Sequence, residues 1–443
     1  MNLRRISNWL FNLDAHYPRT IIAGVLFITV VLGWKVFNLE LDPSIRSMLP
    51  QDHSIVRSIE KIDRLFSGSD IVIIAVESDS LFNSNTLEKL SSFQDSLEEI
   101  PSISRVTSIF TQKHILPTQE GFKIEPLLAE IPTDSSEHIL FIDRLNNSGV
   151  LDNLISSDYS KMCFIGQINS SFDFDEFEFR KNIYGLVDKF SNPEQFYVSS
   201  LPITQATIID NMQRDMRVFT PVAIGLGIFL LMLSFRSWTG VFLPFFVVGF
   251  SIIWTFGIMG WLNMSLAFIG TLIPVMLVAI ANNYGIHIIS HYFEYSKSDP
   301  TSTKGQILRK TIRKVGIPIL LAGLTTIISF LSLFTHALPR AREMGLLISF
   351  GILVSFILSI FLIPSVLVLV SRPHYITKDK SMTFINNLLV GMGEFFTRYR
   401  IHVLIIFSIL GIWLSIGIKD LKVDTNPDNY FPESSKLRVA NTK

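Results

Sequence analysis

Three consecutive polar residues interrupt one of the most apolar stretches of this chain. Asn282, Asn283 and Tyr284 lie within the apolar run 266–289. An amide inside a bilayer costs free energy unless it finds a partner, and a hydrogen bond between membrane helices contributes about 0.6 kcal/mol. The two amides therefore either hold helices together, or let Asn283 exchange a hydrogen bond with an acid on another segment. In the second case Tyr284 would act as a relay or a cap.

Two threonines in the next apolar run extend this candidate network. Thr325 and Thr326 lie within the run 315–335. Small residues let membrane helices approach closely, which favours a packing role for both. The alternative is a polar network in which the two hydroxyls face Asn282, Asn283 and Tyr284.

Other chemistry is poorly supported by the sequence. His287 and His291 are four residues apart on one helical face, but no third ligand is evident, so we predict no metal site. The single cysteine, Cys163, excludes an internal disulfide and a multi-cysteine zinc site. The chain has no P-loop, no Gly-x-Ser-x-Gly and no His-Glu-x-x-His sequence. We therefore expect no cofactor and no enzymatic activity.

The composition predicts a membrane protein. Hydrophobic residues make up 48% of the chain, charged residues 17%, and the mean hydropathy is +0.40. Lys and Arg number 38, as do Asp and Glu, and this balance argues against a nucleic-acid partner. A membrane-spanning helix needs about 20 apolar residues. Seven runs meet this length approximately: 20–37, 218–235, 240–261, 266–289, 315–335, 345–370 and 401–418.

The basic residues predict the orientation of these spans. Arg4, Arg5 and Arg19 flank the first run, and Lys and Arg are frequent in the connections 290–314 and 371–400. Cytoplasmic connections carry an excess of Lys and Arg. The amino terminus is therefore predicted to be cytoplasmic, and residues 38–217 are predicted to lie on the outer side.

That outer segment reads as a folded α+β unit. Strand-like runs are expected at 70–76, 103–110, 161–168 and 195–199, and helices at 85–100 and 176–190. Units of this size and order suggest the split βαβ arrangement. Residues 382–396 have an amphipathic pattern, which suits a helix on the inner membrane face or a short helix packed on the bundle.

The end of the chain repeats its beginning. Leu39–Asp42 and Leu49-Pro50 recur 382 positions later as Leu421–Asp424 and Phe431-Pro432, each time after an apolar run. A repeat this long indicates a duplicated unit. We expect the chain to be one half of a tandem protein plus the opening of a second half.

The order of these elements resembles the resistance-nodulation-division (RND) superfamily of transporters, and within it the MMPL-type predicted exporters. Beside the repeated segment, the residues that carry the resemblance are Ser200-Leu201-Pro202, Tyr284-Gly285-Ile286-His287, Gly323-Leu324-Thr325-Thr326 and Phe330-Leu331-Ser332. The resemblance covers the entire chain. It implies a membrane helical bundle with an inserted extracytoplasmic α+β domain of the porter type, in a multi-pass protein of a bacterial inner membrane.

The resemblance also implies a division into domains. Residues 1–38 hold the cytoplasmic amino terminus and the first span, and residues 39–217 form the porter-like domain. Residues 218–370 form a five-helix bundle similar to a sterol-sensing region, and residues 371–400 the interfacial helix. Residues 401–443 hold the seventh span and the start of a second outer domain.

One departure from the family pattern bears on function. Relatives carry Gly-x-Gly-x-Asp-Tyr on the fourth span, whereas this chain has Ala279-Ile280-Ala281-Asn282-Asn283-Tyr284. Asn283 replaces the acid, so proton coupling requires an acid from the second half, expected near 665, which is 382 positions after Asn283.

The resemblance implies export of a lipid or another hydrophobic substrate. The alternative is a lipid-binding receptor or scaffold of the same fold that does not transport. Expected partners are the substrate, membrane lipids, the second half of the protein, and either further copies of the chain or a periplasmic protein.

Overall fold

A computed structural model describes residues 17–44, 47, 50, 54–58, 61, 70–118, 121–128, 130–147, 154–169, 174–370, 380–421, 432–433 and 435–442. Several residues used above lie outside these ranges. They are Arg4, Arg5, Leu49, Lys422, Val423, Asp424 and Phe431.

Seven helices in the described residues are long and apolar enough to cross a membrane. They are α2 (Pro18–Val36), α8 (Leu201–Phe235), α9 (Trp238–Trp261), α10 (Ile273–Ser298), α11 (Lys304–Leu331), α12 (Pro339–Leu369) and α14 (Arg400–Ile416). A 3-10 turn, η2 (Phe268–Leu272), leads into α10. Each helix overlaps one of the seven predicted runs, which confirms the membrane helical bundle.

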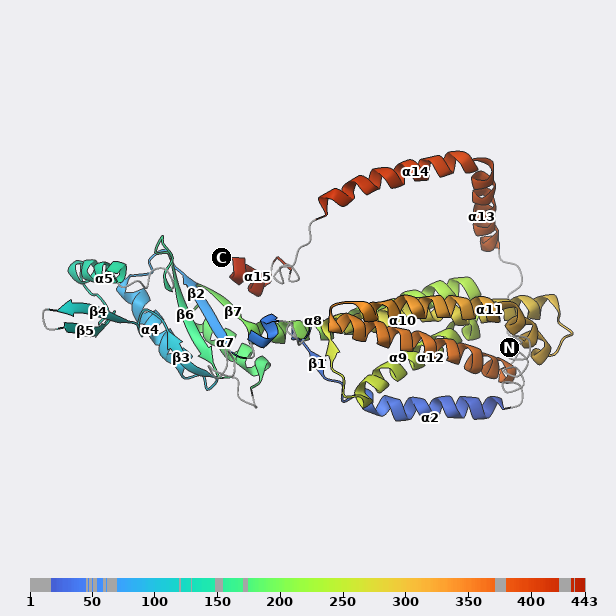
Figure 1. The fold of residues 1–443 in the computed structure, drawn as a ribbon, viewed down its shortest axis with the longest axis horizontal. Helices are drawn as coiled ribbons and strands as arrows, with labels where there is room; N and C mark the ends of the chain where they lie inside the picture. Colours follow the sequence, from blue (N-terminus) through green and yellow to red (C-terminus); the bar gives the residue numbers. More distant parts are fainter. Residues whose placement is uncertain are drawn as a thin grey trace.

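Helices α9, α10 and α12 form the centre of this bundle (Figure 1). Gly285 of α10 allows a close crossing, since a Cβ atom there would lie 3.1 Å from Pro244 on α9 and 3.0 Å from Ile363 on α12. Helices α2, α8 and α11 pack around this centre. Helix α14 has no buried residue and stands apart from the bundle (Figure 1).

The segment between α2 and α8 contains the predicted α+β unit. Its four-stranded antiparallel sheet has the order β3-β6-β2-β7, formed by β3 (Ile103–Thr107), β6 (Lys161–Ile168), β2 (Ile71–Glu77) and β7 (Gln195–Ser200). Helix α4 (Ser84–Glu98) connects β2 to β3, and α7 (Glu176–Phe190) connects β6 to β7. Because β6 lies between β2 and β3, this is the split βαβ arrangement.

Alternation along the strands builds the core of this unit. Val72, Ile74 and Val76 of β2 are fully buried, and the residues between them are more exposed. The buried face packs on the two helices, for example through the edge-to-face contact of Phe93 on α4 with Phe164 on β6, at 5.1 Å. Helix α7 begins at Asp175, whose carboxylate accepts hydrogen bonds from the N–H groups of Phe177 and Glu178.

Several parts of the fold were not predicted. Strands β4 (Lys113–Thr118) and β5 (Gly121–Pro126) form a hairpin, and α5 (Ser135–Asn147) follows it. Beside the bundle, β1 (Leu41–Asp42) pairs in parallel with β8 (Leu266–Ala267). This short pair joins the end of α2 to the segment that precedes α10.

A C-terminal helix packs against the α/β unit. In α15 (Lys436–Thr442), the side chain of Leu437 is 3% exposed and belongs to the same core as β2 and α4. The Ser199 hydroxyl on β7 donates a hydrogen bond to Asn441 Oδ1 at 2.7 Å, and Lys436 Nζ lies 5.0 Å from the ring centre of Tyr184 on α7. The tail after the seventh span therefore covers the β7 edge of the sheet (Figure 1).

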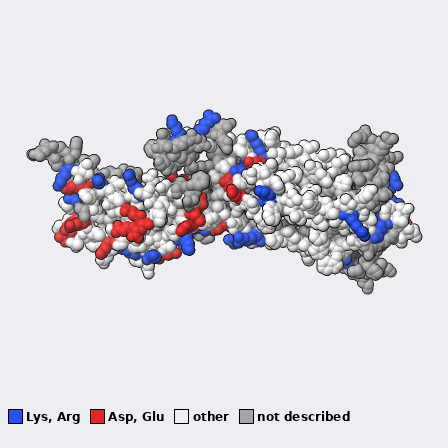
Figure 2. Space-filling view, turned by 90° about the horizontal axis from the view of Figure 1, so that it is seen from below, with Lys and Arg blue, Asp and Glu red and all other residues white. Residues whose placement is uncertain are grey.

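The distribution of charged residues differs between the two parts of the molecule. Asp and Glu gather over the α/β unit, whereas the side of the bundle shows few charges along most of its length (Figure 2). Helix α8 runs without a break from the unit into the bundle, across the boundary predicted at 217/218. The predicted helix at 382–396 lies within α13 (Lys380–Arg398).

The aromatic-rich segment 172–179 of the unit is described from Phe174 onward. Phe172 and Asp173 are outside the described residues. Phe179 is 1% exposed and its ring lies 5.4 Å from that of Phe174. Phe179 is therefore a core residue of the α/β unit.

Candidate intramembrane site

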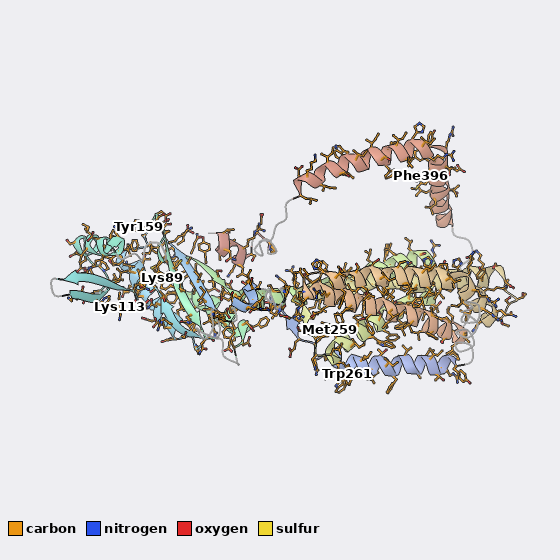
Figure 3. All side chains as sticks on the ribbon, viewed as in Figure 1. Lys89, Lys113, Tyr159, Met259, Trp261 and Phe396 are labelled. Carbon is orange, nitrogen blue, oxygen red and sulfur yellow. The ribbon has the colours of Figure 1, made fainter. Side chains whose placement is uncertain are left out.

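The length of α9 indicates how deep the polar residues lie within the membrane. Trp238 and Trp261 are the two ends of α9, both are mostly exposed, and Figure 3 labels Trp261. Tryptophan is enriched where membrane meets water. At 1.5 Å per residue the two lie about 35 Å apart, close to the roughly 30 Å of a bilayer core. Asn283 lies ten residues into α10, about 15 Å along the helix and so near mid-depth.

Asn282 points into the bundle. The residue is 7% exposed, and within the described part of the chain its Oδ1 has no hydrogen-bond partner. The neighbouring carbonyl of Ala281 accepts a hydrogen bond from Ser355 Oγ on α12 at 3.0 Å. A buried acceptor without a partner costs about 1–3 kcal/mol, so Asn282 lowers the stability of this bundle as it stands.

Tyr284 connects α10 to α11. Its side chain is 3% exposed, and its ring packs edge to face on Phe356 of α12 at 6.0 Å. The hydroxyl lies near Thr326 on α11, whose own hydroxyl donates a hydrogen bond to the Ala322 carbonyl at 2.8 Å. Gly323 of α11 lies beside it, and a Cβ atom at that position would be in ordinary van der Waals contact with the Tyr284 oxygen, at 3.6 Å.

Asn283 lies on a different face. At 3.6 residues per turn, Asn283 is rotated roughly 160–200° from Ala281 and Gly285, which contact α12 and α9. Its side chain is exposed, as is that of Thr325, whose hydroxyl donates to the carbonyls of Leu321 and Ala322 on its own helix. Of the five predicted residues, the structure thus brings Tyr284 and Thr326 together, buries Asn282, and leaves Asn283 and Thr325 on the outer face of the bundle.

The one side-chain hydrogen-bond partner that the structure gives to the His287–His291 pair, within the described residues, is Glu294. His291 Nδ1 lies 2.8 Å from Glu294 Oε2, one turn further along. Among the described residues, no three His, Cys, Asp or Glu side chains are close enough together to hold a metal ion.

A charged cluster at the edge of the bundle was missed by the sequence analysis. Arg340, at the start of α12, donates hydrogen bonds to Asp42 at the end of β1 and, at 2.7 Å, to Glu343 Oε2. Its guanidinium also reaches Ser47 Oγ at 3.3 Å and Ser265 Oγ at 3.5 Å. The side chains of Arg340 and Asp42 are only 14% and 17% exposed. Asp42 belongs to the segment that is repeated near the end of the chain.

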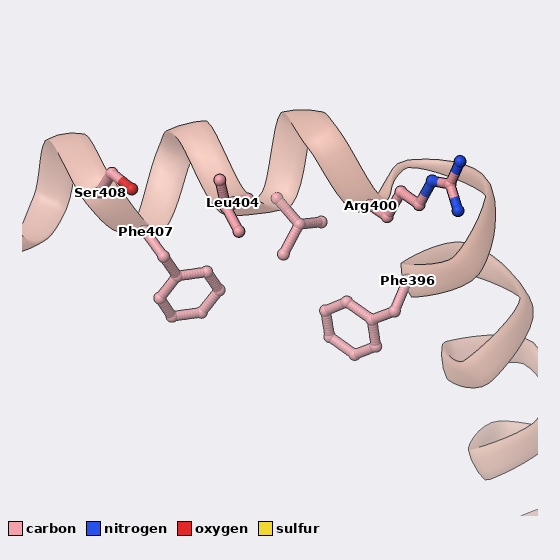
Figure 4. A pocket seen from close by; sticks show the side chains of 6 residues that line it. Phe396, Arg400, Leu404, Phe407 and Ser408 are labelled. Carbon is pink, nitrogen blue, oxygen red and sulfur yellow. The ribbon is translucent and has the colours of Figure 1, made fainter.

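The hollows among the described residues include two apolar ones. One, of about 440 Å³, lies between α2, α9 and α12. The other, of about 520 Å³, lies in the corner between α13 and α14 and is lined by residues such as Phe396, Leu404 and Phe407 (Figure 4). Because α14 stands apart from the bundle, this second hollow has walls on one side only.

The described residues contain seven long apolar helices, with an α/β unit inserted between the first two and amides at mid-depth. These features define a multi-pass membrane protein with a large domain outside the bilayer. The sequence model of the MMPL family matches residues 47–402, and the chain belongs to that family. A protein of Methanocaldococcus jannaschii, named only as a membrane protein, is 23% identical over 397 residues, which cover 84% of this chain and 95% of the relative. That relative therefore holds little beyond the matched region.

Proposed function

We propose that this chain is one unit of an RND-type transporter that exports a lipid or another hydrophobic substrate toward the side of the α/β unit. The observation that carries the proposal is the group Asn282-Asn283-Tyr284 at mid-depth in the bundle of an MMPL-family protein. Polar residues inside a membrane are costly, and they commonly mark the path of an ion or a substrate.

The exposed face of α10 is where a second bundle would bind. Asn283 and His287 lie on this face, and an amide facing lipid would leave its hydrogen-bonding groups unsatisfied. A second bundle that brings an acid opposite Asn283 would satisfy the amide and supply the proton carrier that this unit lacks. We assign the second bundle to the following half of the same protein, in which an Asp is expected near 665.

A second copy of the chain could cover the same face, and a cross-linking experiment separates the two arrangements. In a Cys163→Ala background, Asn283→Cys would be oxidised in native membranes. The assignment to the following half predicts that the chain remains a monomer on a denaturing gel. A disulfide-linked dimer at Asn283→Cys, absent at Leu226→Cys on α8, would instead show that two copies pair through α10.

In this proposal the α/β unit acts as a porter domain that receives the substrate outside a bacterial inner membrane. The amino terminus is then cytoplasmic, because the α/β unit and the start of α2 are at opposite ends of the bundle (Figure 1). A reporter fused at Ser298 should be cytoplasmic and one at Ser135 external. Both reporters on one side of the membrane would contradict the topology.

Transport is tested with the complete protein in proteoliposomes. A pH gradient should drive movement of a fluorescent phospholipid between leaflets, and Asn283→Leu should slow it by about 10-fold or more, equivalent to 1.4 kcal/mol. The control is Ser234→Leu, a polar-to-apolar change at an exposed position of α8.

The rival function is a lipid-binding receptor or scaffold of the same fold. It predicts that the second half contains no acid within its membrane spans and that a pH gradient has no effect. In that case proton-driven transport would be abandoned.

A further inference from the structure

An apolar pocket lies between α2, α9 and α12 at the end of the bundle farthest from the α/β unit. Its volume is about 440 Å³, within the range of about 300–1,000 Å³ that is typical of ligand sites. Residues from the first half of α2, the first half of α9 and the last turns of α12 line it, among them Leu26, Phe246 and Val366.

The pocket exists because α2 and α9 diverge. Near the α/β unit the two helices cross closely, since a Cβ atom at Gly257 or Gly260 would lie 2.6 Å from Leu32 O or 2.5 Å from Lys35 O. In the middle, Trp254 Nε1 donates a hydrogen bond to Thr29 Oγ1 at 2.9 Å. Beyond that bond α9 presents Phe242, Phe246 and Phe250 to the pocket, and these bulky side chains hold the helices apart.

The mouth of the pocket faces the region that lipid acyl chains occupy. Leu26 and Phe246 line it and are 48% and 56% exposed. Trp238 also lines it, with its ring stacked on Phe242 at 5.2 Å. Since tryptophan prefers the membrane–water boundary, the pocket extends from that boundary into one leaflet.

A positive charge lies at the boundary end of the pocket. Arg19 is exposed and precedes Ile22 by three residues, so both lie on one face of α2, with Arg19 one turn closer to the water. The start of α2 adds the partial positive charge of a helix N-terminus. The pocket therefore combines an apolar cleft for a chain with a cationic end for a phosphate.

We propose that this pocket binds one anionic phospholipid, with an acyl chain between α2, α9 and α12 and the phosphate beside Arg19. The site is separate from the polar group on α10 and does not depend on transport. The bound lipid fills the space between the diverging helices and so supports α2, which joins β1 and the α/β unit to the bundle.

The test uses the full chain purified in detergent. Phosphatidylglycerol or phosphatidylcholine is added, and native mass spectrometry counts the lipids bound. One phosphatidylglycerol should bind saturably, and more tightly than phosphatidylcholine. Leu26→Trp and Val366→Phe fill the pocket from two helices, and each should weaken binding by about 10-fold. Leu26 is half-exposed, so that variant should fold normally.

Charge and position are controlled separately. Arg19→Gln should remove the preference for phosphatidylglycerol, whereas Lys314→Gln, at an exposed position of α11, should keep it. Leu226→Trp, exposed on α8, should leave binding unchanged. The proposal is overturned if binding does not saturate, if both filled variants bind as the native protein does, or if Arg19→Gln keeps the preference.

Discussion

Arg340 and Asp42 form an ion pair across 298 positions of sequence, and the pair fastens the end of β1 to the start of α12. Asp42 lies on the segment between α2 and the α/β unit, and Arg340 lies at the edge of the central helices. A displacement of α12 at this edge should therefore also move the segment that leads to the α/β unit.

Replacing the arginine should loosen this connection. Arg340→Met leaves the carboxylates of Asp42 and Glu343 close together without their common donor. Loss of one partner of a fully buried pair costs about 3–5 kcal/mol, and partial exposure reduces this to roughly 1–3 kcal/mol. The melting temperature of the purified protein should fall.

The matched control is Arg342→Met, two residues further along α12. Arg342 is exposed and donates to the carbonyl of His336, so its loss should have a small effect. In the double variant Arg340→Met with Asp42→Asn, the two losses should be less than additive, because both remove the same contact. Strict additivity would show that the ion pair contributes nothing.

We expect Asn282 to be required for transport although it lowers the stability of the bundle. Asn282→Leu replaces a buried amide whose Oδ1 lacks a partner among the described residues with an apolar group of similar size. Removal of an unsatisfied acceptor relieves about 1–3 kcal/mol. The melting temperature should stay the same or rise, and transport should fall.

Ser355→Ala, on the facing helix α12, is the comparison variant, and unlike Asn282→Leu it should destabilise the protein. It removes the hydrogen bond to the Ala281 carbonyl and should cost about 0.5–1.5 kcal/mol. If Asn282→Leu destabilises the protein as much as Ser355→Ala, the amide has a structural partner and the functional interpretation of Asn282 fails.

Leu437 should stabilise the edge of the sheet. Leu437→Ala removes a buried side chain of α15, at a cost of about 2–5 kcal/mol. Hydrogen exchange should become faster at the backbone amides of β7, the edge strand that α15 covers. Leu421→Ala, at a position that is 75% exposed, is the control. Unchanged exchange in β7 would mean that α15 does not protect the edge.

Cys163 should react slowly with thiol reagents. Burial in the sheet raises the pKa of its thiol above the ordinary value, and the thiolate is the reactive form. The folded protein therefore holds less thiolate than an unfolded chain at the same pH. Alkylation followed by mass spectrometry should be slower in the folded protein, and the difference should shrink as the pH rises through the folded-state pKa.

The raised pKa of Cys163 also makes the stability of the folded protein depend on pH, with a defined sign. The pKa of the thiol is higher in the folded than in the unfolded protein. Its contribution to the stability of the folded state is therefore lost as the pH rises from the pKa in the unfolded chain, about 8.5, through the pKa in the folded protein. An alkylation rate at neutral pH equal to that of the denatured protein would contradict this account.

The sequence predicted those elements whose signal is local. The limits of β6 and α7 were predicted correctly, because β6 alternates between buried and half-buried residues and α7 follows a capping aspartate. The seven long helices were predicted from hydropathy alone. The hairpin β4–β5 was missed because Pro117 lies within β4 and Pro126 ends β5, and a proline argues against a strand.

Features that depend on distant contacts could not be predicted. Asn282 and Asn283 are adjacent in sequence but differ in burial, and only the packing of α10 on α9 and α12 decides which of them is inside. The contact of Tyr284 with Thr326 was anticipated only as an alternative. The Arg340 cluster joins β1, the segment before β8 and α12, and no sequence pattern near Arg340 indicates these partners.

The position of α15 also sets the order in which the protein can be completed during synthesis. Ser199 and its partner Asn441 are 242 positions apart, and a ribosome adds about 5–20 residues per second, so roughly 10–50 s separate their emergence. Within that interval six of the seven long helices must be inserted. The nascent chain thus exposes an unprotected sheet edge throughout membrane insertion, and the outer unit closes only after the last of these helices is in place.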